Sequence, residues 1–148
     1  VLFFLGILLA VSSLQTGGQL NDMASGLDKT FGTDSETGIY IVGGLIGLLS
    51  AIVDNVPLVA AVMGMYELVP GTFFAQDALF WQFLAYCAGT GGSVLIIGSA
   101  AGVAVMGLER IPFGWYLKKV SFLALIGYAC GILAYILQAW IISISNSI

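Results

Sequence analysis

Asp54 is the residue best placed to do chemistry, because it is the only charged residue between Tyr40 and Tyr66. A carboxylate deep in a bilayer costs at least about 2.5–3.5 kcal/mol on insertion scales. No Lys or Arg lies near Asp54 in sequence to pair with it. Such a group is normally protonated, bound to a cation or open to water, and an ion site uses each of these states. The alternative is a structural carboxylate paired to a part of the protein outside this chain.

The neighbours of Asp54 favour the ion site. Pro57 lacks an N–H and disfavours helix at the residue before it, yet it suits the first turn of a following helix. The sequence therefore predicts an unwound segment around residues 53–56, whose carbonyls lose their helical partners. Asn55 and Ser50 add side-chain oxygens, the ligands that hard cations prefer. We expect a Na⁺ site at Asp54 and Asn55, with Ser50 one turn before it.

A second break is predicted at the Gly-rich run 89–93. Its glycines permit backbone angles that other residues resist, and its serine suits the N-cap of a helix from Val94. The carbonyls of residues 88–90 are then free to face the first break. The candidate residues of this second break are Thr90, Gly91, Gly92 and Ser93. Two broken helices in succession indicate an ion-binding site, whereas two kinked structural helices are the alternative. A phosphate loop is disfavoured because the run lacks a P-loop lysine.

The composition indicates what surrounds these breaks. Of 148 residues, 59% are hydrophobic and 8% charged, against about 45–50% and about 25% in soluble domains. A soluble chain of this size has too little interior for so much apolar surface, so we expect an all-α integral membrane protein whose main partner is the lipid bilayer. Four Lys and Arg argue against nucleic-acid binding, and the absence of His excludes imidazole chemistry.

Apolar and polar stretches divide the chain into segments. We expect the end of a transmembrane helix at 1–16, a polar outer loop at 17–38, a helical hairpin at 39–69 broken at 54–57, a broken transmembrane helix at 79–108 with its break at 89–93, a connection at 109–119, and a transmembrane helix at 120–142. The apolar runs on either side of Asp54 cover only about 22 and 18 Å, too short to span about 30 Å alone. A calcium site in the outer loop is disfavoured, since no DxDxDG spacing occurs.

The positive charges predict the orientation. Arg110, Lys118 and Lys119 fall in one connection, which the positive-inside tendency places in the cytoplasm. The loop 17–38 and the turn 70–78 then face outward, and the hairpin between them becomes re-entrant. The apolar start of the chain lacks the basic region of a signal peptide, so we expect a truncated membrane helix and a chain that is a fragment.

Two long motifs resemble a known family. SAIVDNVPLVAAVMGMY (residues 50–66) and GTGGSVLIIGSAAGVAVMGLERIPFGWYLKK (residues 89–119) are similar to NhaD-type sodium/proton antiporters, and residues 3–16 fit the preceding helix. The resemblance implies the ion transporter superfamily, built from inverted repeats in which a re-entrant hairpin and a broken helix meet at the substrate site. Asp54 and Asn55 would lie at the hairpin tip, and residues 90–93 would form the unwound part of the facing helix.

The same resemblance implies that this chain is the C-terminal repeat and that the first repeat is its missing partner. The protein would exchange Na⁺ or Li⁺ for H⁺ across the bacterial inner membrane, with no cofactor and no enzymatic reaction. Sodium-coupled uptake of an organic anion and a non-transporting membrane subunit remain alternatives. An intramembrane aspartyl protease is disfavoured, because it needs two carboxylates in one site. The oligomeric state stays open, with a homodimer among the options.

Overall fold

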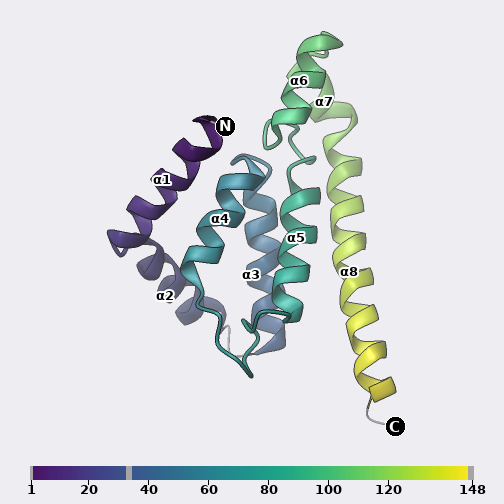
Figure 1. Ribbon diagram of the computed structural model, residues 1–148. Helices are drawn as coiled ribbons and strands as arrows, with labels where there is room; N and C mark the ends of the chain where they lie inside the picture. The colour runs from purple at the N-terminus through teal and green to yellow at the C-terminus, as the bar shows by residue number, and fades with distance from the viewer. Residues whose placement is uncertain (1, 33–34, 147–148) are drawn as a thin grey trace.

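The computed structural model describes residues 2–32 and 35–146, and over these ranges the chain is helical with no strand (Figure 1). The expectation of an all-α chain is confirmed at this level. The helices are α1 (Leu2–Thr16), α2 (Gln19–Phe31), α3 (Glu36–Leu49), α4 (Asn55–Met65), α5 (Leu79–Gly91), α6 (Ala100–Leu108), α7 (Phe113–Lys119) and α8 (Ser121–Asn146).

The core of the fold is the packing of α3 against α5. Glycines on α3 let the two backbones approach closely. A Cβ added at Gly43 would lie 2.7 Å from the Phe83 ring, and one added at Gly47 would lie 2.6 Å from the Cys87 Cβ. The α4 helix lies beside this pair and also contacts α1 and α2, whereas α8 packs along the other side of α5 (Figure 1). Both predicted breaks therefore belong to the two central elements.

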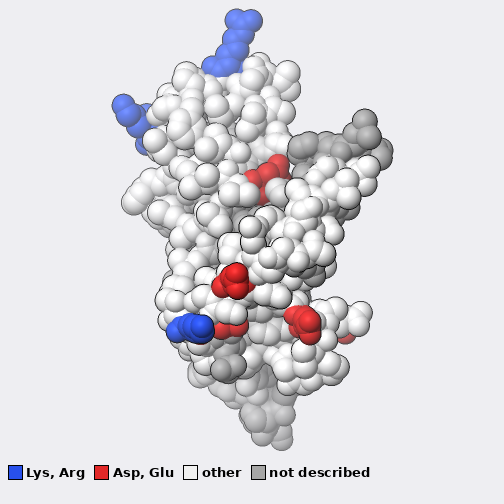
Figure 2. Space-filling model, turned by 90° about the vertical axis from the view of Figure 1, so that its left-hand side faces the viewer, with Lys and Arg blue, Asp and Glu red and all other residues white. Residues whose placement is uncertain are grey.

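Helices α3 and α4 form a hairpin. They are antiparallel, and the start of α3 and the end of α4 both lie at the end of the molecule where α5 begins and α8 finishes (Figure 1). Helices α6 and α7 lie at the opposite end. In the view of Figure 2, basic side chains lie at that end, acidic side chains lie below them, and one further basic side chain lies lower, beside acidic ones. The membrane orientation expected from the charges stays a prediction.

Helix α8 is the one element of the described residues that is long and apolar enough to cross a membrane, judged by length and composition. That stretch, Ser121–Ser145, has few buried residues. Large apolar side chains such as Phe122, Leu133 and Trp140 are exposed along it. The transmembrane helix expected at 120–142 is thus present as a helix, with an outer surface suited to lipid.

The predicted polar loop at 17–38 is wrong in its secondary structure, because it contains α2. Met23, Leu27 and Phe31 recur every four residues, so they lie on one helix face, and the last two pack against the core. Glycines with positive φ, Gly18 at 77° and Gly32 at 65°, flank this helix. The polar composition of the segment indicated a loop, so this short amphipathic helix was not predicted. Residues 33–34 of the predicted loop, like residues 1 and 147–148, lie outside the described ranges.

The positions of both breaks differ from those predicted. The first comprises residues 50–54 rather than 54–57, because Pro57 fits within the first turn of α4. The second comprises residues 92–99 rather than 89–93, because α5 remains helical through the glycines to Gly91. Ser99, not Ser93, caps the helix that follows, its side chain accepting a hydrogen bond from the N–H of the third helical residue. The connection at 109–119 also contains α7.

Candidate cation site

The first break leaves a row of backbone oxygens without partners. Helix α3 ends in tight turns, in which the N–H groups of residues 50–53 donate to carbonyls of residues 46–49. Within the described part of the chain, the carbonyl oxygens of residues 50–53 accept no hydrogen bond. Such carbonyls are costly in an apolar setting unless something satisfies them. A cation supplies that satisfaction directly.

Asp54 follows these carbonyls as the N-cap of α4. It is partly buried, and its Oδ1 accepts a hydrogen bond of 3.0 Å from the Val56 N–H. No Lys or Arg nitrogen of the described residues lies within 4 Å of this carboxylate, where it would form an ion pair. Asp54 therefore combines a capping role with an oxygen, Oδ2, that is available to a cation or a proton.

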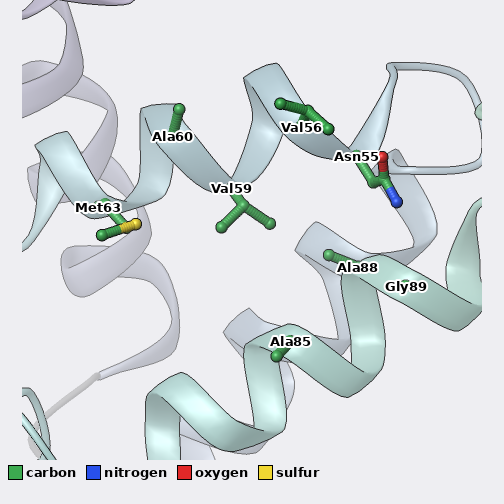
Figure 3. Close-up of a pocket in the computed structure, with 8 residues that line it drawn as sticks. All are labelled: Asn55, Val56, Val59, Ala60, Met63, Ala85, Ala88 and Gly89. Atoms are coloured by element: carbon green, nitrogen blue, oxygen red, sulfur yellow. The ribbon is translucent and has the colours of Figure 1, made fainter.

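Asn55 lies at one end of an open groove of about 420 Å³ between α4 and α5 (Figure 3). The groove is lined by Asn55, Val56, Val59, Ala60, Met63, Ala85, Ala88 and Gly89. Asn55 is the one polar side chain among these residues, and it extends from α4 toward α5 (Figure 3). The structure thus places Asn55, the residue after Asp54, at one end of this groove, and its role as a cation ligand stays a prediction.

Ser50 is placed differently from its neighbours. Its side chain has no exposed surface, and its hydroxyl donates to the Ala88 carbonyl of α5 at 2.8 Å. This bond joins residues 38 positions apart in the chain. The Ser50 oxygen, predicted to be a cation ligand, therefore lies in the contact between α3 and α5, with its proton donated to Ala88.

The hydroxyls of the second break donate within their own segment. Thr90 Oγ1 donates to the Tyr86 carbonyl at 2.7 Å, and Ser93 Oγ donates to the Thr90 carbonyl at 2.6 Å. The Ala88 and Thr90 carbonyls thus already accept hydrogen bonds, contrary to the expectation that the carbonyls of residues 88–90 are free. This makes them weaker candidates for cation ligands than the carbonyls of the first break.

Tyr116 is a contact that the sequence did not indicate. Its hydroxyl, on α7, donates to the Ser93 carbonyl at 2.6 Å. Burial raises the pKa of Tyr116, so the hydroxyl stays protonated and remains a donor. The basic end of the molecule is thereby joined to the second break. A tyrosine 23 residues away carries no sequence signal for this contact.

The two breaks lie against each other. A Cβ added at Gly91 would lie 2.6 Å from the Gly47 carbonyl carbon, so the two backbones touch. A Cβ added at Gly98 would lie 2.7 Å from the Ala51 carbonyl carbon and would also collide with the Ser50 carbonyl oxygen. The structure therefore brings Ser50, Gly91 and Gly92 into one cluster, with Asp54 and Asn55 continuing from it at the hairpin tip. Gly98 belongs to a GxxxG pattern, the only hint of this packing in the sequence.

Comparison with known proteins yields relatives that are named as transporters. The chain is 56% identical over 135 residues to sodium/proton antiporter 1 of Arabidopsis thaliana, covering 91% of this chain and 22% of that protein. It is 50% identical to sodium/proton antiporter 2 of the same plant, over 91% of this chain and 30% of that protein. It is 37% identical to the Na⁺/H⁺ antiporter NhaD of Vibrio parahaemolyticus, over 87% of this chain and 28% of that protein.

This chain therefore spans between a fifth and a third of the length of these relatives. No family model matches it, and no solved structure matches it. The relatives are named as antiporters rather than enzymes, which agrees at that level with the expected class. They come from plants as well as bacteria, so the bacterial inner membrane stays a prediction.

Proposed function

Because this chain is homologous over most of its length to part of the NhaD-type sodium/proton antiporters, we propose that the full-length protein exchanges Na⁺ or Li⁺ for H⁺ across a membrane. The observation that carries the proposal is the first break. There, a row of unpaired carbonyls leads directly into a carboxylate that has no basic partner within 4 Å among the described residues. Those are the ligand types that a hard monovalent cation takes.

In this proposal one carboxylate serves both ions. Asp54 holds a proton in one state and helps to coordinate Na⁺ in the other, together with Asn55 and carbonyls of residues 51–53. A protonated Asp54 carries no charge to attract the cation, so binding of one ion displaces the other. Competition for a single group couples the two fluxes without any covalent step, and the site opens to the other face when it holds either ion.

The proposed membrane arrangement follows the shape of the hairpin. We propose that α3 and α4 enter and leave from the outer side, with the first break near the membrane midplane. The basic α6–α7 end then lies in the cytoplasm, as the positive-inside tendency favours. Helix α8 crosses the whole membrane. The rest of the protein, proposed to include an inverted repeat of this unit, covers the open groove beside Asn55.

Sodium-coupled uptake of an organic anion fits the described residues less well. The helix N-terminus nearest the groove is that of α4, and the Asp54 side chain already caps it. A fixed carboxylate at that position repels an anion. The anion mechanism becomes the better account only if Na⁺ moves without moving protons.

The test is a proton-flux measurement on the full-length protein. Inside-out membrane vesicles are first acidified by respiration, and the collapse of the pH gradient is followed after NaCl or LiCl is added. Wild type should dissipate the gradient, and Asp54→Asn, which keeps the size but not the charge, should not. The exposed Asp77→Asn is the matched control and should behave as wild type. A wild-type protein that leaves the gradient unchanged on adding either salt rules out exchange.

A further inference from the structure

The end of α3 is held on one side by the end of α5 and on the other side by the second break. On one side, the Gly91 backbone contacts the Gly47 peptide, and Ser50 Oγ donates to the Ala88 carbonyl. On the other side, Gly98 lies against the Ser50–Ala51 peptide. We call this set of contacts the clasp. It consists of the α3 end (Gly47–Ala51), the α5 end (Ala88–Gly92) and Gly98.

Ser50 donates the one side-chain hydrogen bond that joins two members of the clasp among the described residues, and it does so from a fully buried position. A Cβ added at Gly92 would lie 3.5 Å from Ser50 Oγ, so backbone closes over the hydroxyl on that side as well. Asn55 lies at one end of the groove between α4 and α5, whose lining includes Ala88 and Gly89 but not Ser50. The hydroxyl therefore lies in the contact between α3 and α5 and does not line the groove beside Asn55.

We infer that Ser50 is a positioning residue for the cation site rather than one of its ligands. This inference rests on the proposed exchange of Na⁺ for H⁺. The Ser50–Ala88 bond fixes the last turn of α3 on α5, and the carbonyls of residues 51–53 leave directly from that fixed turn. The Ser50–Ala88 bond therefore sets the direction of these carbonyls, because only a few backbone angles separate them from Ser50.

The expected effect can be worked from a population shift. A buried neutral hydrogen bond contributes about 1–1.5 kcal/mol, and 1.4 kcal/mol corresponds to a factor of ten. If Ser50→Ala leaves about one molecule in ten with the carbonyls correctly directed, the apparent affinity falls about tenfold. The ligands themselves are unchanged, so Na⁺ and Li⁺ should lose affinity by the same factor. Removal of a ligand would instead affect the two ions unequally, because they differ in size.

The experiment measures the half-saturating Na⁺ and Li⁺ concentrations and the maximum rate, in the vesicle assay with the full-length protein. The variants are Ser50→Ala and Gly98→Ala, with Gly107→Ala as the control. A Cβ at Gly98 would press on the Ser50 carbonyl without removing any side chain, whereas a Cβ at Gly107 meets nothing within 4 Å. The amount of protein in the membrane is measured for each variant. If Ser50→Ala does not accumulate, Ser50→Cys, which keeps a weaker donor, replaces it.

The inference is supported if Ser50→Ala and Gly98→Ala raise both half-saturating concentrations about tenfold and equally, at a near-normal maximum rate, while Gly107→Ala changes neither. An unchanged Ser50→Ala in an active protein overturns it, and so does an unequal change for Na⁺ and Li⁺, which would make Ser50 a ligand. A loss of maximum rate alone, with unchanged half-saturation, would reduce Ser50 to a structural role. A wild type without exchange refutes the proposed function itself and is recognised before any variant is compared.

Discussion

Gly91→Ala tests the close approach of the two breaks. The added Cβ would lie 2.6 Å from the Gly47 carbonyl carbon and closer still to its oxygen. Because both partners are backbone, no flexible side chain can move aside to make room. The helices α3 and α5 must separate locally, and the Ser50–Ala88 hydrogen bond that spans them lengthens as they do.

The magnitude follows from two opposing terms. Overpacking a well-packed interior costs about 1–3 kcal/mol, whereas replacing Gly by Ala within a helix favours folding by up to about 1 kcal/mol. Gly91 is the last residue of α5, so the favourable term is smaller here than in a helix interior. With about 0.5 kcal/mol for the favourable term, we expect a net loss of about 0.5–2.5 kcal/mol in the free energy of unfolding.

The assay is reversible denaturation of the purified full-length protein in detergent, compared with Gly127→Ala. Gly127 lies on α8, and a Cβ there meets nothing within 4 Å. That control should be neutral or up to about 1 kcal/mol more stable, from helix propensity alone. Equal stability of Gly91→Ala and Gly127→Ala would refute the close backbone contact. It would also remove the basis for treating the two breaks as one cluster.

Two further predictions concern the scaffold and the orientation. Tyr128→Phe removes the hydroxyl that donates to the Gly44 carbonyl at 2.7 Å, so unfolding should become easier by about 1 kcal/mol; an unchanged denaturation midpoint would contradict the role of that bond. Cysteines replacing Lys118 and Thr72 should react with a membrane-impermeant maleimide from opposite sides of the membrane, the first only from the cytoplasm. Labelling of both from one side would overturn the proposed topology.

The first break could be predicted because its signals are local. Asp54 is an unpartnered charge in an apolar run, and Pro57 restricts the backbone within three residues of it. The predicted boundaries were late by a few residues, since Pro57 lies inside the first turn of α4 rather than before it. A side chain can thus mark the place of a break while the packing decides its limits.

The second break was misplaced because the role of its glycines is tertiary. Gly91 remains helical and allows a close contact with Gly47, whereas the sequence predicted that it breaks the helix. Gly98, which was read as helix packing, lies inside the break and contacts the α3 end. A glycine gives the same sequence signal in both situations, so only the position of its neighbour across the fold separates them.

Ser50 shows the same limit for a polar side chain. Its spacing of one turn from Asp54 made it a plausible ligand, but its partner is a carbonyl 38 residues away. No local sequence pattern indicates that Ser50 pairs with the Ala88 carbonyl. The α2 helix was missed for a related reason, because its apolar residues are few and only their periodicity distinguishes the segment from a loop.

The most direct test of the account is proton release on cation binding. The purified full-length protein, in weakly buffered detergent solution with a pH indicator, is mixed with NaCl at a series of starting pH values. If Na⁺ and H⁺ compete for this carboxylate, wild type releases protons in proportion to the Na⁺ bound, and choline chloride releases none. Asp54→Asn should release none with either salt. Proton release that persists unchanged in Asp54→Asn would contradict the claim that this residue carries both ions.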